Sequence, residues 1–259
     1  HNGRRRQRQM CIRDSPLAIK STGAKAIKAK ARDWGHDLNL MKDLVDENTK
    51  VIFLATPNNP TGTVLESSDI EEFLEAIPSN IAVFVDQAYF EYIEEDKYKI
   101  SFDLVKKYKN LIISRSFSKA HGLAALRLGY AVSSEEIAEF LNRVRQPFNT
   151  NSLALAAGVE AVTDKEHIAK SIEINKSGME KIKKAFDELD FKYIESFGNF
   201  ISFDSQMDSD SSFDFFLRKG IILRSLKVYE MPQHLRVSIG LDDEMDAFIK
   251  ALKQYKKAF

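Results

Sequence analysis

The sequence predicts an α/β protein, with a mostly parallel sheet buried on both faces and a smaller α+β region at the C-terminal end. Short unbroken apolar runs, such as those at 51–55 and 81–85, alternate with segments whose apolar residues recur at helical spacing. Continuous apolar strands separated by helices are typical of parallel sheets that helices cover on both sides. From residue 149 onward the pattern changes to long helical stretches and alternating strands, which predicts the smaller region.

The elements of the first region follow from local chemistry. The run at 51–55 predicts a strand, which ends before Pro57 and Pro60 because proline cannot donate to a central sheet. Apolar residues at helical spacing between 70 and 77 predict the helix that follows. Further strands are expected at 81–85, from 111 to 113, and at 128–132.

The second region has a different pattern. Residues 149–189 contain few helix breakers and predict mostly helix. Between 235 and 239 the apolar residues alternate with polar ones, which places Arg236 on the face opposite its apolar neighbours. Strands are also expected at 200–203 and 221–223, and the last helix has an apolar stripe made of Met245, Phe248, Ile249, Leu252 and Tyr255.

We expect three parts along the chain. Residues 1–15 hold five arginines without apolar periodicity, and such blocks of like charge are usually solvated. We therefore predict a disordered or artefactual tail there and leave it out of the fold. Residues 16–163 are expected to form a large domain, and residues 164–259 a small C-terminal domain.

Composition excludes several classes of function. The 38 basic and 38 acidic residues cancel, so no global charge favours nucleic acid or an anionic membrane. Cys11 is the only cysteine, which excludes an intrachain disulfide and a cysteine-based metal cluster and fits a cytoplasmic setting. The histidines lack the spacing of metal ligands, and no apolar run is long enough to cross a bilayer, so we expect neither a metal nor a membrane.

Polar residues follow the first three predicted strands. Ligands of parallel α/β sheets bind beyond the carboxyl ends of the strands, so these side chains are expected to surround one pocket. They are Asn59 after the first strand, Asp86 and Tyr89 after the second, and Ser116, Ser118 and Lys119 after the third.

The residues around Lys119 suit a phosphorylated aldehyde. A lysine amine held in a pocket is a nucleophile toward a carbonyl, although a lysine taken alone is most often a surface residue. Ser116 and Ser118 offer two hydroxyl donors and Arg127 a guanidinium fork, and this combination suits a phosphate dianion.

Each remaining candidate has two interpretations. Asp86 ends a buried strand, where its carboxylate either pairs with a protonated pyridine nitrogen or caps a turn. Tyr89 is either a hydrogen-bond donor or a packed aromatic, and Asn59 either faces a ligand or completes a turn. Arg236 and Arg224 either bind a substrate anion or pair with surface acids.

Taken together, the motifs resemble those of fold-type I pyridoxal-phosphate (PLP) aminotransferases of class I and II. The resemblance runs from about Pro16 to the C-terminus, and the motifs stand in family order and at family spacing. They are PNNPTGT at 57–63, DQAY at 86–89, SFSK at 116–119 and RLGY at 127–130. Within that superfamily, RQPFN at 145–149 and LRVSIG at 235–240 look most like histidinol-phosphate aminotransferases.

The resemblance implies a fold and a set of cofactor contacts. Residues 16–163 would form part of the large PLP-binding domain of a fold-type I transferase. Lys119 would bind the cofactor covalently and shuttle a proton, and Asp86 would keep the pyridine nitrogen protonated. Asn59 and Tyr89 are implied at the cofactor's phenolic oxygen, and Ser116, Ser118 and Arg127 at its phosphate.

The resemblance also implies substrates and partners. Arg236 would bind the substrate anion, with Arg224 and Asn59 assisting. The implied reaction transfers an amino group between histidinol phosphate and 2-oxoglutarate in histidine biosynthesis. The implied partners are a small-molecule amino donor, a 2-oxo acid and a second copy of the chain.

Two departures leave alternatives open. Family members carry a glycine-containing phosphate loop, a ring-stacking aromatic and an inter-subunit tyrosine before the position of Pro16, and residues 1–15 do not resemble that segment, so we expect an N-terminally truncated chain. Glu230 stands where glycine is common. The alternatives are an aromatic-amino-acid aminotransferase, a threonine-phosphate decarboxylase, or an inactive fragment or ligand-sensing domain. Ser116 and Lys119 also fit the S-x-x-K motif of a class of serine enzymes. That class would also need the motifs S-D-N and K-T-G, which do not occur in this sequence.

Overall fold

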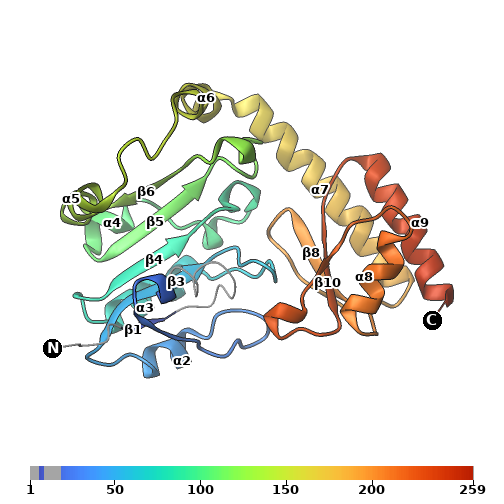
Figure 1. The fold of residues 1–259 in the computed structure, drawn as a ribbon, viewed down its shortest axis with the longest axis horizontal. Helices are drawn as coiled ribbons and strands as arrows, with labels where there is room; N and C mark the ends of the chain where they lie inside the picture. The colour runs from blue at the N-terminus through green and yellow to red at the C-terminus, as the bar shows by residue number, and fades with distance from the viewer. Residues whose placement is uncertain (1–5, 9–18, 259) are drawn as a thin grey trace.

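The computed structural model describes residues 6–8 and 19–258 and contains two sheets. Figure 1 shows the larger sheet at the left, the smaller one at the right, and helix α7 (Lys165–Glu188) running from one to the other. The predicted α/β fold class is confirmed. The proposed division into residues 16–163 and 164–259 falls at the short break between α6 (Ser152–Thr163) and α7, and we keep it as a proposal.

The larger sheet has six strands in the order β2-β1-β3-β4-β5-β6. Neighbouring strands are parallel except for β6, which runs antiparallel to β5. The connection between β5 and β6 holds only the short turn η3 (Ala124–Leu126), whereas a parallel return needs a crossover segment. The strands are β1 (Arg6–Arg8), β2 (Lys25–Ile27), β3 (Thr49–Ala55), β4 (Ala82–Asp86), β5 (Leu111–Ser116) and β6 (Gly129–Ser133).

The four strands expected in this region are confirmed as β3 to β6. Strand β1 was not expected, because it lies within the segment predicted as a tail. The rest of that segment, residues 1–5 and 9–15, lies outside the described residues, so its prediction stays a prediction.

Helices pack against this sheet through apolar stripes. Helix α3 buries Ile70, Phe73 and Leu74, which join strand residues such as Ile52 and Val83 in one core. The remaining elements are α2 (Leu38–Asp43), α3 (Ser67–Ala76), η1 (Phe90–Tyr92), η2 (Asp96–Tyr98), α4 (Leu104–Lys107) and α5 (Glu135–Val144). Within the described ranges, no helix combines the length and apolar character needed to span a membrane.

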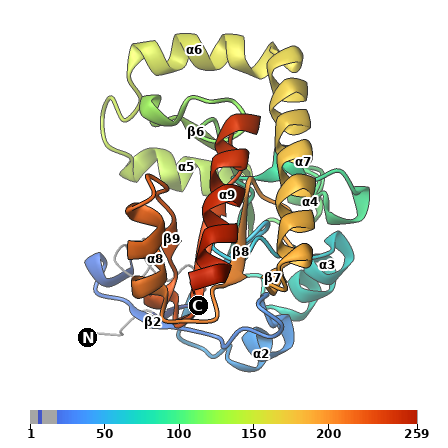
Figure 2. The same cartoon turned by 90° about the vertical axis from the view of Figure 1, so that its right-hand side faces the viewer.

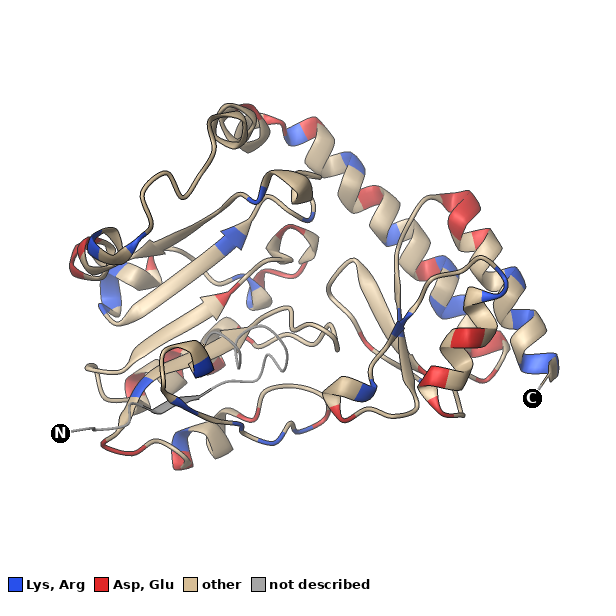
Figure 3. Cartoon of the chain, viewed as in Figure 1, with Lys and Arg blue, Asp and Glu red and all other residues tan. Residues whose placement is uncertain are grey.

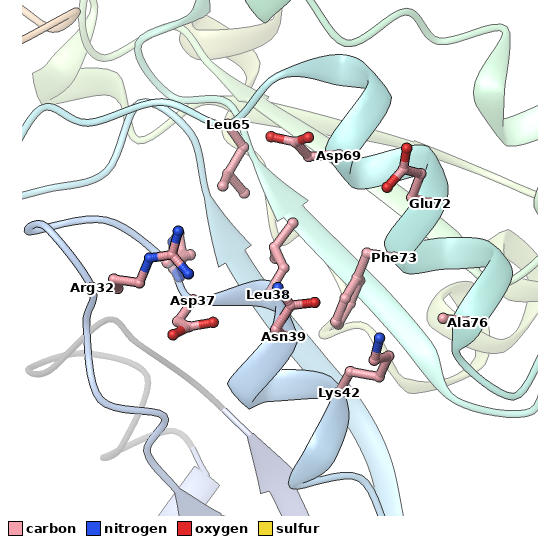
Figure 4. Close-up of a pocket in the computed structure, with 11 residues that line it drawn as sticks. Arg32, Asp37, Leu38, Asn39, Lys42, Leu65, Asp69, Glu72, Phe73 and Ala76 are labelled. Carbon is pink, nitrogen blue, oxygen red and sulfur yellow. The ribbon is translucent and has the colours of Figure 1, made fainter.

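A polar cavity of about 410 Å³ lies between α2 and α3 (Figure 4). His36 lines it, and its Nε2 lies 3.0 Å from the carbonyl oxygen of Ala55 at the end of β3. Burial lowers the pKa of His36 to about 4, so the ring is neutral at physiological pH. None of the nine candidate site residues lines this cavity. The cavity is therefore distinct from the predicted site.

The smaller sheet is antiparallel, in the order β7-β8-β10-β9. Its core includes Phe186, Phe203, Phe216 and Phe248, and Figure 2 shows α7, α8 and α9 together on its outer side. The elements are β7 (Tyr193–Ile194), β8 (Phe200–Asp204), α8 (Ser209–Leu217), β9 (Arg224–Ser225), η4 (Lys227–Tyr229), β10 (His234–Ser238) and α9 (Asp242–Ala258).

The strands predicted at 200–203 and 235–239 and the last helix are confirmed, but the strand predicted at 221–223 is wrong. The backbone N–H of Ile221 donates to the carbonyl of Phe216 and closes the end of α8. Gly220, at φ +78°, makes that turn possible. Pairing with β10 therefore begins only at Arg224.

Hydrogen bonds to backbone carbonyl oxygens help to join the smaller region to the loop after β3. The Ser202 hydroxyl donates to the carbonyl oxygen of Pro60 at 2.6 Å, and the Phe197 N–H donates to that of Gly62 at 2.9 Å. A Cβ at Gly62 would lie 2.0 Å from Oγ of Ser196, so only glycine fits. The loop that carries Asn59 is thus held from the side of the smaller sheet.

We expect Gly62→Ala to destabilise the protein more than Gly23→Ala. Both glycines have positive φ, which costs alanine roughly 1–2 kcal/mol, but only Gly62 also faces a close neighbour. The overlap with Ser196 should add about 1–3 kcal/mol. Urea unfolding of the two variants and the wild type measures the difference, and equal losses for both variants would contradict the close approach.

Candidate active site

The carboxyl ends of β3, β4 and β5 bring four predicted side chains together. Asn59 Nδ2 donates to the phenolic oxygen of Tyr89 at 3.3 Å. Nζ of Lys119 lies 5.1 Å from the centroid of the Tyr89 ring, which is buried. Asp86, the last residue of β4, is close enough to Lys119 for the ammonium to stabilise its carboxylate. The sheet edge therefore places an amine, a carboxylate, a phenol and an amide in one cluster.

The Asp86 carboxylate is half-buried and held at one oxygen. Its Oδ1 accepts from the Ala88 N–H at 3.1 Å and from the Ser114 hydroxyl at 3.2 Å. Burial raises the pKa of Asp86, while these two donors and Lys119 oppose that rise. Within the described part of the chain, Oδ2 receives no hydrogen bond. The residue thus offers one free carboxylate oxygen at the strand end.

Arg236 approaches the cluster from the smaller sheet. Its guanidinium donates to Oδ1 of Asn59 and lies 4.7 Å above the ring of Phe200. Burial lowers the pKa of Arg236, and its Nε is buried without a partner in the structure. A guanidinium with an unsatisfied buried N–H is suited to receive an anion.

Arg224 lies opposite Arg236 in the β9–β10 ladder. Its guanidinium donates to the hydroxyl of Tyr229 at 3.4 Å, and its charge helps to lower the pKa of Arg236. The two arginines on neighbouring strands create a local positive field. Among the described residues, no carboxylate bonds to either guanidinium.

The three predicted phosphate ligands lie at the end of β5 and in the connection between β5 and β6, and no hydrogen bond between Arg127 and either serine occurs in the described part of the chain. Ser116 pairs with Gly129 across β5 and β6, and its Oγ accepts from the Ser118 N–H at 3.0 Å. Arg127 has φ +57° and donates to the carbonyl of Ala124 within its own turn. The Arg127 side chain is exposed. The pairing of β5 with β6 brings the backbone of Arg127 near Ser116, whereas its guanidinium points to its own turn.

A family model described as "Aminotransferase class I and II" matches residues 16–252. The chain belongs to this aminotransferase family. The match covers strands β2 to β6 of the larger sheet, the strand-end cluster and most of the smaller region, as the motif resemblance implied.

Two relatives are similar to this chain over most of its length. Histidinol-phosphate aminotransferase 1 of Idiomarina loihiensis is 46% identical over 93% of this chain and 66% of that protein. Histidinol-phosphate aminotransferase 2 of Pseudomonas aeruginosa is 47% identical over 92% of this chain and 64% of that protein. The chain thus spans slightly less than two thirds of the length of both relatives.

Solved structures share the fold. The histidinol-phosphate aminotransferase of Sinorhizobium meliloti, in complex with pyridoxal-5'-phosphate, superposes with a TM-score of 0.88 at 23% identity, over 98% of this chain and 71% of that one. The histidinol-phosphate aminotransferase of Clostridium acetobutylicum superposes with a TM-score of 0.90 at 18% identity, over 99% of this chain and 78% of that one. Together these matches support the predicted fold-type I architecture.

The sequence analysis did not single out two residues that contact this cluster. Ser114 interrupts the apolar run of β5 opposite Asp86, and that interruption was the available signal. Phe200 lies beneath Arg236 and contacts the ring of Tyr89 edge-on at 5.2 Å, which no local pattern reveals. Glu230, which stands where glycine is common in the family, is largely exposed, and its Oε1 lies 3.9 Å from Nζ of Lys28.

Proposed function

We propose that this protein is a PLP-dependent aminotransferase that exchanges an amino group between histidinol phosphate and 2-oxoglutarate. The observation that carries the proposal is the cluster of Lys119, Asp86, Tyr89 and Asn59, with Arg236 bonded to it from the second sheet. The substrate follows from relatives that are 46–47% identical and named histidinol-phosphate aminotransferases.

The residues present fit the pyridine ring of PLP, and they also fit the anionic group of a substrate. The free Oδ2 of Asp86 can accept a hydrogen bond from a protonated ring nitrogen, which compensates the burial of its charge. The unpartnered Nε of Arg236 suits a carboxylate or phosphate oxygen. When bound, PLP supplies the electron sink that makes the substrate's α proton labile.

Each side chain then has a defined task. Lys119 Nζ holds the cofactor and moves the proton at the substrate α carbon. Because the Tyr89 oxygen accepts from Asn59, its own proton remains available to the cofactor's phenolic oxygen. Asp86 keeps the ring-nitrogen proton in place. Ser116, Ser118 and Arg127 are proposed at the phosphate, and Arg236, with Arg224 and Asn59, at the substrate anion.

PLP should label Lys119 selectively. We expect borohydride reduction of the PLP-treated chain, followed by peptide mass mapping, to find the modification on Lys119 and to lose it in Lys119→Ala. Lys109→Ala, which removes a lysine just before β5, is the matched control and should keep the label. Label spread over many lysines, or none at all, would contradict the proposed cofactor site.

Arg236→Lys should lower kcat/KM for histidinol phosphate and for glutamate by about a hundredfold. Lysine keeps the charge but loses the planar fork that can bond Asn59 and an anion together. Arg218→Lys, on the exposed end of α8, is the control and should leave kcat/KM unchanged. Steady-state kinetics decides, and equal rates for Arg236→Lys and the wild type would remove Arg236 from substrate binding.

We further propose that the protein forms a homodimer, supported by exposed apolar side chains on α5 and α6, and that it is cytoplasmic, which its single cysteine fits. Most of the large apolar side chains that are exposed in the described residues lie between 140 and 162. Figure 3 shows α6 almost without charged residues, and a helix that is apolar all round is normally buried. We define this α5–α6 surface as Phe140, Leu141, Val144, Phe148, Leu153, Leu155, Val159 and Val162.

Val159→Lys should disrupt the dimer, whereas Ile222→Lys should not. The two side chains are similarly exposed, at 70% and 79%, but only Val159 belongs to the α5–α6 surface. Sedimentation equilibrium at micromolar concentration should give a dimer for the wild type and Ile222→Lys, and a monomer for Val159→Lys. A monomeric wild type would refute the proposed assembly.

A further inference from the structure

Ser114 faces the carboxylate of Asp86 across two neighbouring strands. The two residues are direct partners in the β4–β5 ladder, and the Ser114 hydroxyl donates to Oδ1 of Asp86 at 3.2 Å. The Ala88 N–H reaches the same oxygen from the following turn at 3.1 Å. Two donors from different segments thus fix one carboxylate oxygen and leave the other free.

We propose that Ser114 is a positioning residue, which orients the Asp86 carboxylate so that its Oδ2 accepts the ring-nitrogen proton of PLP. The inference rests on the proposed function and adds to it a residue that does not touch the substrate. A carboxylate bonded only by the Ala88 N–H could rotate about χ2, whereas a second donor from β5 restrains it.

The strand pattern of β5 supports this role. Leu111, Ile112 and Ile113 are buried and apolar, so an aliphatic residue at 114 would continue the run. A serine there gives up apolar burial for a hydrogen bond to a partly buried charge, and such bonds are stronger than neutral ones. Alternation also puts Ser114 on the same face of β5 as Ser116, while Arg115 on the other face bonds the buried Gln87.

The contact can be tested without cofactor. In carbon-detected NMR of the cofactor-free chain, with the Asp86 signal assigned by Asp86→Asn, we expect Ser114→Ala to raise the pKa of Asp86. In the wild type, the Ser114 hydroxyl donates to the carboxylate and so stabilises its ionised form. Removing that hydroxyl should therefore raise the pKa of Asp86, because the effects of burial and of Lys119 are unchanged. Ser114→Thr keeps a hydroxyl and should titrate as the wild type does. Ser133→Ala, a half-buried serine on β6, is the control.

The cofactor-binding measurement separates this inference from the proposed function. Fluorescence titration should give a dissociation constant for PLP about tenfold higher in Ser114→Ala, and within about twofold of wild type in Ser114→Thr and Ser133→Ala. Equal PLP affinity in Ser114→Ala and the wild type, or an unchanged Asp86 titration, overturns the role of Ser114 and leaves the proposed function intact. Failure of the wild type to bind PLP overturns both.

Discussion

The site depends on the half-buried carboxylate of Asp86 at the end of β4. Taking a charge out of water is costly unless donors compensate it, and here a backbone N–H, a serine hydroxyl and a nearby ammonium do so. All three come from the edge where parallel strands end together. The sheet topology, by aligning β3, β4 and β5, is therefore what makes an ionised carboxylate tolerable beside Lys119.

The parts of the fold that could be read from sequence were those with strong local periodicity. Strands β3, β4 and β5 each contain a short unbroken apolar run, at 51–55, 82–85 and 111–113, and α9 has a single apolar stripe. The error at 221–223 arose because Ile221 closes the end of α8, a tertiary use of its N–H that an apolar triplet cannot reveal. The direction of β6 likewise depends on the short connection before it, not on its own residues.

Candidate residues of the site were predictable as chemical types but not as contacts. Asn59, Asp86 and Lys119 follow strands, so topology alone brings them to one edge. The bond between Arg236 and Asn59 joins residues far apart in the sequence, and it needs the packing of two sheets to exist. Ser114 was missed because a serine within a strand has no motif of its own. Only the register of β4 and β5, which pairs Ser114 with Asp86, shows that its hydroxyl contacts the carboxylate.

The side-chain amide of Asn59 is one of the contacts that join the two sheets, and it lies in the site itself. Asn59 accepts from Arg236 through Oδ1 and donates to Tyr89 through Nδ2, so one side chain connects the second sheet with the strand-end cluster. The loop that carries it is held by Ser202 and by the close approach at Gly62. A displacement of the smaller sheet therefore moves both hydrogen bonds of Asn59 together. The same amide that orients the guanidinium also decides which way the Tyr89 proton is free to point.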